Sequence, residues 1–320
     1  MTEFLTIGEP IALFGSKEVD LSLKDATQFQ KFLAGAEVNV AVGVSRLGHS
    51  STYISQVGKD PFGDFIIDAL KKNKIETALV GQTPDYWTAF QLKDRVSTGD
   101  PSIFYFRKGS AAAHFDPNIL RNIDFSTLKF AHLSGIFPAI SQQACQAFTQ
   151  LIELLAHHHI PTTFDPNLRP QLWESTEKMR DTLNHFASFA TIVLPGINEG
   201  EILVGSRDPN EIADFYLQNG TATQIVIVKL GEEGAFIKTK QGEAYTVPGF
   251  HVTKVVDTVG AGDGFAVGLL TGLMENLSLK EAVIRANAVG ALAVQSAGDS
   301  DGYPTKEELD TFLKAQEVVL

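Results

Sequence analysis

The stretch of sequence that decides the fold, residues 255–268, reads Val-Val-Asp-Thr-Val-Gly-Ala-Gly-Asp-Gly-Phe-Ala-Val-Gly. A β-branched run leads into a glycine-rich turn, and the small and apolar residues after it indicate an amphipathic helix. Glycines let backbone N–H groups approach a ligand without an intervening Cβ. The first turn of a helix adds unpaired N–H groups and the positive end of the helix dipole. The segment therefore predicts a site for an anion such as phosphate.

An acidic residue inside this turn, Asp263, suggests more than binding, because its charge would repel a bound phosphate. It fits a transfer reaction in which Asp263 accepts the proton of an attacking hydroxyl while the glycine amides hold a γ-phosphoryl group. The alternative is a tight strand-to-helix turn without chemistry. Two other glycine motifs fail: Phe265 stands where a dinucleotide-binding fingerprint needs its third glycine. The phosphate loop that ends in Lys-Ser/Thr is absent from the sequence.

The composition limits the classes of function. The chain has 320 residues, 44% hydrophobic and 20% charged, which is typical of a globular protein. Its net charge of −12 argues against a nucleic-acid partner. No stretch approaches the roughly 20 apolar residues of a membrane span, and no signal peptide is recognisable, so we expect no membrane partner. The single cysteine, Cys145, excludes an internal disulfide and fits a cytoplasmic location.

Short apolar segments alternate with helical patterns along most of the chain, which predicts a parallel sheet covered by helices on both faces. Two segments break the alternation and predict an antiparallel ribbon outside that sheet, 87–92 and 102–106. A hairpin is expected at 235–247, with its turn at Gln241-Gly242. The expected strands are 4–7, 130–133, 161–164, 192–194 and 225–228, and the expected helices are 37–47, 62–72, 142–157, 178–186, 210–218 and one opened by the capping box at Ser278.

The segment Asp257 to Phe265 closely resembles the C-terminal signature of the ribokinase-like (PfkB) carbohydrate kinases. Residues 34–41 resemble the N-terminal sugar-binding segment of that family, 57–63 its Gly-x-Asp-x-x-Gly stretch, and 198–201 its Asn-x-x-Glu motif. The resemblance extends over nearly the whole chain, and it implies a sugar kinase that uses ATP and Mg²⁺. The catalytic residues that it implies are Asp263, Gly260, Ala261 and Gly262.

The resemblance also implies a fold. It is an α/β fold, a ribokinase-like three-layer α/β/α sandwich with a mostly parallel central sheet and a small β-sheet lid. We expect one domain over 1–320, with lid segments roughly within 11–34, 50–56 and 86–108. An exposed edge of the lid sheet would invite pairing with another copy, and lid-to-lid dimers are common in the family, so we expect a homo-oligomer formed through the lid.

Roles in nucleotide and metal binding follow from the same resemblance. Glu201 is expected to act on Mg²⁺ through water, together with Asn198, because Mg²⁺ usually keeps several waters and uses few carboxylates. Asn198 could instead be a helix N-cap, and Asn287 a polar residue on a small-residue helix face. A monovalent cation such as K⁺ is implied near Asp257. The expected nucleotide-binding residues are Asn167, Arg169, Asn198, Lys229, Gly231, Gly234, Gly260, Gly262 and Asn287.

Within the family, the closest resemblance is to kinases of 2-keto-3-deoxygluconate. It is carried by residues 34–39, 104–111, 164–173 and 298–299. Arg107 and Arg169 offer planar forks of N–H donors that suit a substrate carboxylate. Gln91 stands where members of this subgroup can carry a tyrosine, and fructokinases share most of the remaining pattern. The expected substrate-binding residues are Gly35, Asn39, Gln91, Tyr105, Arg107, Arg169, Asp263 and Asp299.

Simpler interpretations remain for two of these residues: Arg107 could pair with an acidic neighbour at the lid surface, and Tyr105 could be ordinary strand packing. Three other functions stay open: a fructokinase of the same fold, a sugar or nucleotide sensor without catalysis, and a nicotinamide-dependent oxidoreductase. The sensor has no use for Asp263, and the glycine spacing disfavours the oxidoreductase.

Overall fold

The computed structural model describes residues 2–99, 101–296 and 300–320. A large central sheet runs through it in the order β14-β13-β12-β11-β10-β9-β1-β4-β5, with β6 paired to β4. The strands from β12 to β5 are parallel, whereas β13 and β14 form the expected antiparallel hairpin at one edge. The strands are β1 (Phe4–Ile7), β4 (Ser51–Gly58), β5 (Ile75–Glu76), β6 (Val80–Thr83), β9 (Phe130–Ser134), β10 (Thr162–Asp165), β11 (Ile192–Val193), β12 (Ile225–Lys229), β13 (Ala235–Thr239) and β14 (Ala244–Val247).

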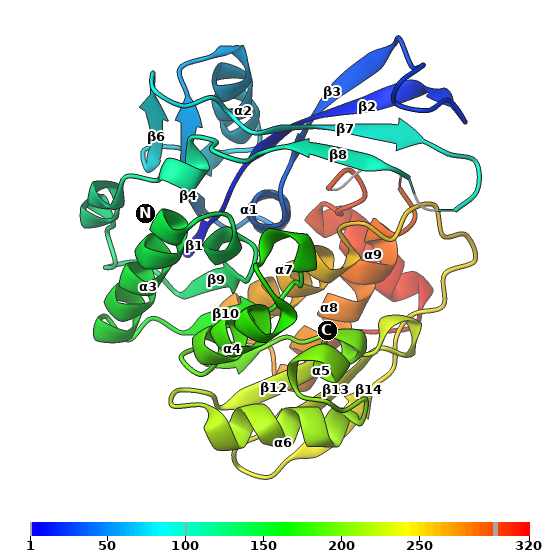
Figure 1. Ribbon diagram of the computed structural model, residues 1–320. Helices are drawn as coiled ribbons and strands as arrows, with labels where there is room; N and C mark the ends of the chain where they lie inside the picture. Colours follow the sequence, from blue (N-terminus) through cyan, green and yellow to red (C-terminus); the bar gives the residue numbers. More distant parts are fainter. Residues whose placement is uncertain (1, 100, 297–299) are drawn as a thin grey trace.

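Helices cover both faces of the sheet, so the predicted three layers are confirmed (Figure 1). Successive residues of β1 show why: Phe4 joins the hydrophobic cluster on one face and Leu5 the cluster on the other, as strand geometry requires. The helices α1, α2, α7, α8 and α9 pack in the first cluster, and α3, α4, α5 and α6 in the second. Their bounds are α1 (Ala36–Arg46), α2 (Pro61–Lys72), α3 (Gln142–His157), α4 (Thr176–Ala187), α5 (Ile197–Leu203), α6 (Pro209–Asn219), α7 (Ala261–Met274), α8 (Leu279–Ala293) and α9 (Lys306–Ala315).

The helix after the glycine-rich turn, α7, is buried almost all round rather than amphipathic. It packs against both α1 and α8. A Cβ on Gly268 would lie 2.6 Å from the Cα of Ala286, so the glycine permits the close approach of α8. The β-branched run before the turn forms no strand, and Val256 is instead tied to the end of α8 by a 2.8 Å bond from its N–H to the carbonyl of Val294. This packing fixes where the N-terminus of α7 points.

A second, smaller sheet projects beyond the central sheet and forms the lid (Figure 1). Its order is β3-β2-β7-β8, and the β7–β8 pair is the predicted antiparallel ribbon. The expectation that residues 50–56 belong to the lid is wrong. Residues 51–56 lie in β4, a strand of the central sheet that is buried along its whole length and pairs with β1 on one side and with β5 and β6 on the other. The lid strands are β2 (Ile11–Val19), β3 (Phe29–Ala34), β7 (Phe90–Arg95) and β8 (Ile103–Phe106).

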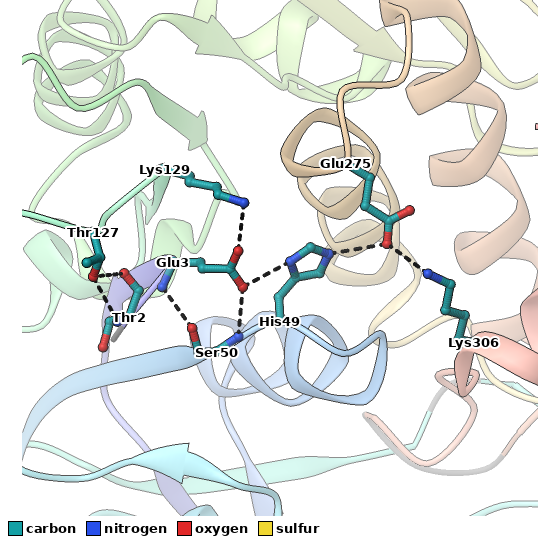
Figure 2. Close-up of polar contacts among 8 residues, drawn as sticks. All are labelled: Thr2, Glu3, His49, Ser50, Thr127, Lys129, Glu275 and Lys306. Atoms are coloured by element: carbon teal, nitrogen blue, oxygen red, sulfur yellow. Dashed lines mark hydrogen bonds and ion pairs between the residues drawn. The ribbon is translucent and has the colours of Figure 1, made fainter.

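A polar network connects several elements at the N-terminal end of β1 (Figure 2). His49, between α1 and β4, contacts Glu3 at 3.3 Å and Glu275, at the C-terminus of α7, at 3.4 Å. Lys129 completes the pair with Glu3 at 2.7 Å, and Lys306 of α9 reaches Glu275 at 3.4 Å. The network lies at the opposite end of α7 from the glycine-rich turn. Over the residues described, no helix has the length and apolar character to cross a membrane.

Candidate active site

The polar residues of the site lie where the parallel strands end. Glu9 follows β1, Asp165 is the last residue of β10, and Lys229 is the last residue of β12. Open α/β sheets place ligand sites at this edge because loops there can turn apart. The edge lines a cavity of about 1030 Å³, covered from the lid by residues of β7 and β8. We call it the sugar cavity, after the ligand that the family resemblance leads us to expect there.

A second cavity, of about 660 Å³, adjoins the first. The two share Lys229, Gly231, Thr258 and Gly262, so they meet at the start of α7. The walls of the second cavity are largely apolar, which suits a flat aromatic base, and Asn287 supplies a polar group. We call it the nucleotide cavity. Its apolar lining includes Phe250, Val252, Val255, Phe265, Ala291 and Val294.

The turn at the junction presents backbone rather than side chains. Gly260 caps α7 with φ 81°, in the left-handed region that glycine adopts without strain. Its carbonyl accepts a 2.7 Å hydrogen bond from the Tyr303 hydroxyl, which fixes the turn. A Cβ on Gly262 would meet, among the described residues, the Nζ of Lys229 at 3.6 Å, so this side of the helix start faces open space beside a cation. The geometry suits an anion held by α7 amides and Lys229.

Asp263 lies in the first turn of α7, 9% exposed, with its carboxylate in the sugar cavity. The side-chain amide of Asn39 donates a 2.9 Å hydrogen bond to Oδ2 of Asp263. Burial raises the pKa of Asp263 to about 7, and Asp165 adds to the rise, while Asn39, Arg169 and Lys229 oppose it. A base whose pKa lies near neutrality combines an available ionised form with useful proton affinity.

Lys229 and Asp165 form an ion pair of 2.6 Å beneath the junction. Burial alone would lower the pKa of Lys229, but Asp165 and Glu199 outweigh it and raise that pKa. Glu199 in turn accepts hydrogen bonds from the backbone amides of Gly196 at 2.7 Å and Leu168 at 2.9 Å. Burial, with the nearby Asp165, raises the pKa of Glu199. Lys229, Asp165 and Glu199 therefore form one cluster of interacting charges beside the start of α7.

The lid contributes three of the predicted substrate residues. Gln91 of β7 and Tyr105 of β8 are cross-strand partners, and both line the sugar cavity. Arg107 follows β8 and lies at the same wall, where its Nη2 is 2.6 Å from Oε2 of Glu9. The acidic partner considered for Arg107 therefore exists, but it is a buried residue of the sheet end rather than of the lid surface. The pair positions a guanidinium over the cavity.

Most of the predicted residues come together, although they are spread along the sequence from Gly35 to Asn287. Gly234, Ala261 and Asn287 line the nucleotide cavity, and the amide of Asn287 donates to the carbonyl of Pro248 at 3.0 Å. Asp299 lies outside the described residues. The sugar cavity is lined by Gly35, Asn39, Gln91, Tyr105, Arg107, Asn167, Arg169, Asn198, Lys229, Gly231, Gly260, Gly262 and Asp263.

One predicted residue lies apart from the others: Glu201 is not among the residues that line the two cavities. Its side chain is 57% exposed and pairs with Arg207 at 2.9 Å. The cavity is lined by the first residues of α5, Ile197 to Glu199, and Glu201 lies farther along that helix. Glu199 is the acidic residue that turns back to the start of α5 and lines the cavity. Asn198 is not the cap of α5, because Gly196 holds that position.

Sequence reasoning also missed buried carboxylates near the site. Glu9, Glu37 and Asp165 line the sugar cavity and are each at most 2% exposed. A signal existed for two of them, because Glu9 and Asp165 directly follow short apolar strands at the edge where parallel strands place ligand sites. Glu37 lies inside the motif that supplied Gly35 and Asn39, but its pattern matched an ordinary helix residue.

Comparison with known proteins identifies the family of this chain. Residues 1–306 match the model of the pfkB family carbohydrate kinase. This chain belongs to that family. It is therefore a phosphotransferase that acts on a sugar hydroxyl, and its fold is the ribokinase-like α/β fold.

Individual relatives of this pfkB kinase are similar over almost their whole length. A 2-dehydro-3-deoxygluconokinase of Bacillus subtilis (strain 168) is 42% identical, over 98% of this chain and 96% of the relative. A probable fructokinase-6 of Arabidopsis thaliana is 32% identical, over 96% of this chain and 82% of the relative. An E. coli protein assigned as Ribokinase II, solved with ATP and Mg²⁺, is 26% identical with a TM-score of 0.87, over 98% of this chain and 100% of that one.

Proposed function

We propose that this kinase transfers the γ-phosphoryl group of ATP to the terminal primary hydroxyl of 2-keto-3-deoxygluconate. The observation that carries the proposal is the position of Asp263, a buried carboxylate at the junction of a polar and an apolar cavity. The polar cavity holds two arginines suited to a sugar acid, Arg107 and Arg169. The 42% identity to a 2-dehydro-3-deoxygluconokinase supports the same substrate.

Several residues of this chain have distinct roles in the proposed reaction. Asp263 accepts the proton of the substrate hydroxyl as that oxygen attacks phosphorus, and Asn39 holds the carboxylate in place. The amides of the Gly260–Gly262 turn and Lys229 stabilise the negative charge that develops on the transferred group. The lid, through Gln91 and Tyr105, closes the sugar cavity and limits the access of water.

ATP and Mg²⁺ fit the residues present. The apolar nucleotide cavity with Asn287 suits an adenine, and the junction with Lys229 suits phosphates. Glu199 and Asp165 would hold Mg²⁺ through their carboxylate oxygens, directly or through water, because oxygen ligands are those that this ion prefers. When bound, the metal would neutralise charge on the phosphate oxygens. We infer that Glu199, which lines the cavity, has the role expected of Glu201.

A sugar acid explains the two arginines better than fructose does, because an uncharged sugar has no carboxylate to pair with them. Replacing Arg107 by alanine would leave Glu9 buried and unpaired, so we choose Arg107→Lys, which keeps the charge and loses the planar fork. We expect kcat/KM for 2-keto-3-deoxygluconate to fall about tenfold or more, with a change of about threefold or less for fructose. Equal losses of kcat/KM for the two sugars would instead favour a fructokinase.

The further expectations for this enzyme are proposals of the same kind. We infer assembly through the lid, because Phe104 is 58% and Phe106 40% exposed on β8. Sedimentation of Phe104→Glu should show smaller species than wild type, and an unchanged distribution would refute the lid interface.

K⁺ near Asp257 would use backbone oxygens, since the carboxylate already pairs with Lys93 at 3.0 Å. A cytoplasmic location agrees with the use of ATP.

A further inference from the structure

The segment between α8 and α9 carries a tyrosine that contacts the glycine-rich turn. The Tyr303 hydroxyl donates a 2.7 Å hydrogen bond to the carbonyl of Gly260, 43 positions earlier in the sequence. Tyr303 is 3% exposed and packs in the same hydrophobic cluster as α7 and α8. A buried tyrosine hydroxyl usually has a hydrogen-bond partner. Here the partner is the residue that caps α7, so the contact connects the C-terminal segment to the junction of the two cavities.

Two glycines make room for the ring of Tyr303. A Cβ on Gly43 of α1 would lie 3.0 Å from Cδ2 of the ring, and a Cβ on Gly264 of α7 would lie 3.1 Å from Cε1. Arg46, the last residue of α1, holds the backbone of the same segment. Its Nη1 donates hydrogen bonds to the carbonyls of Ser300 at 2.6 Å and Tyr303 at 3.1 Å. The ring and the backbone of Tyr303 are therefore both fixed, and its hydroxyl has little freedom to leave its acceptor.

The Gly260 carbonyl is the point at which α7 begins. It also accepts the first hydrogen bond of the helix, from the amide of Gly264 at 2.8 Å, so the Tyr303 hydroxyl uses the second lone pair of the same oxygen. The peptide unit is planar, so the N–H of Ala261 points the opposite way, and it closes the turn on the carbonyl of Thr258 at 3.3 Å. A glycine leaves the backbone many orientations, and the bond from Tyr303 restricts them.

The next two amides, those of Gly262 and Asp263, have no hydrogen-bond acceptor among the described residues. They belong to the first turn of α7, whose N–H groups lack partners within the helix. They lie one and two peptide units beyond the one that Tyr303 holds. A shift at Gly260 would therefore move both amides, and with them the Asp263 carboxylate, relative to a bound phosphoryl group.

We propose that Tyr303 is a positioning residue for phosphoryl transfer. Its hydroxyl fixes the Gly260 carbonyl, and this sets the amides of Gly262 and Asp263 where they stabilise the charge on the transferred group. The inference rests on the role proposed above for the glycine-rich turn, but not on which sugar accepts the phosphoryl group. Donors that act in the transition state must be aimed before the reaction. Losing their alignment lowers kcat and leaves the binding of both substrates nearly unchanged.

Tyr303→Phe removes the hydroxyl and keeps the ring between α1 and α7. We expect kcat, measured with the sugar that the wild type prefers, to fall about tenfold, because misalignment loses part of the roughly 10²–10³ that such a donor contributes. KM for ATP and for the sugar should each change by about twofold or less. Inhibition by aluminium fluoride with Mg·ADP and the sugar, which imitates the group in transfer, should weaken about tenfold, while the Kd of Mg·ADP alone stays the same.

Tyr216→Phe is the matched control for the loss of a buried hydroxyl. Tyr216 is 2% exposed and donates to Oδ1 of Asn184 at 3.1 Å, and neither residue lines the two cavities. Each variant loses one buried hydrogen bond, so both should lower the urea midpoint of unfolding by a similar amount. Only Tyr303→Phe should lower kcat. A kcat that falls equally in both variants would overturn the inference.

Arg46→Met tests the same contact from the other side, because it releases the carbonyl of Tyr303 and removes no group of the turn. We expect kcat to fall about threefold in this variant, and the double variant to be no slower than Tyr303→Phe, since Arg46 acts through the hydroxyl. Effects on kcat that multiply in the double variant, or a Tyr303→Phe enzyme with the kcat of the wild type, would overturn the inference and leave the proposed function intact. If no sugar stimulates ADP release by the wild type, the proposed function fails, and the inference with it.

Discussion

Replacing Asp263 by asparagine should separate the catalytic role of this carboxylate from its effect on stability. Asparagine has the same shape and can still accept a hydrogen bond from the side chain of Asn39, which donates to Asp263 at 2.9 Å. It cannot take the proton of the attacking hydroxyl. General bases contribute roughly 10²–10⁴ in rate, so we expect kcat to fall by about that factor while KM for ATP changes little. The wild-type rate should rise with pH through about 7, where Asp263 ionises.

The same substitution should stabilise the protein at alkaline pH. The pKa of Asp263 is raised from 3.8 to about 7 on folding, so between these values the folded state keeps a proton that the unfolded state has lost. Wild-type stability from this group is therefore full at low pH and declines as pH rises toward 7. At about 1.4 kcal/mol per pKa unit, the loss is about 4 kcal/mol above pH 7. The Asp263→Asn protein should not show this loss of stability with rising pH, because asparagine does not ionise.

Thermal and urea unfolding of both proteins at pH 5 and pH 8 measures the difference. We expect Asp263→Asn to gain roughly 2–3 kcal/mol relative to wild type between these two pH values. Initial rates of ADP release on the same samples give kcat. An Asp263→Asn enzyme with kcat within about tenfold of wild type, or one whose relative stability is the same at both pH values, would refute the assignment of Asp263 as a buried base.

Three other substitutions test the surroundings of the site. Lys229→Met leaves Asp165 buried without its partner, so we expect a loss of about 3–5 kcal/mol by urea unfolding and a weaker KM for ATP; unchanged stability would argue against the 2.6 Å pair. Glu199→Gln should lower kcat/KM for Mg·ATP about tenfold or more, whereas the matched variant Glu201→Gln should stay within about twofold; the reverse order would restore Glu201 as the metal residue. His49→Leu should lower stability by about 1 kcal/mol with unchanged kcat, and a loss of activity would mean that the distant network acts on the site.

Most strands and helices of the fold could be predicted from the sequence, because the strands are short, apolar and buried on both faces. The helix 142–157 and the strand 4–7 were predicted at the bounds that the structure has. The lid segment 50–56 was not, because β4 carries polar residues such as Ser51 and Ser55 that are buried by pairing. Strand pairing between distant segments is decided by tertiary contacts that a local pattern does not contain.

The site could be predicted as far as its motifs reached. Asp263 and the glycine turn were found because their residue types and spacing carry the chemistry, and Arg107 and Arg169 because the family resemblance implied them. Glu199 was missed because the choice between two nearby acids depends on where α5 begins, at Ile197. Glu37 was missed because its burial depends on the absent side chain of Gly8, 29 positions earlier in the sequence.

The most direct test of the whole account is the sugar preference of the wild-type enzyme. ADP release with ATP and Mg²⁺ should be measured for 2-keto-3-deoxygluconate, fructose, ribose and 2-keto-gluconate. A cavity lined by Asp263, Arg107 and Arg169 predicts the highest kcat/KM for 2-keto-3-deoxygluconate. A higher kcat/KM for fructose would contradict the roles given to Arg107 and Arg169.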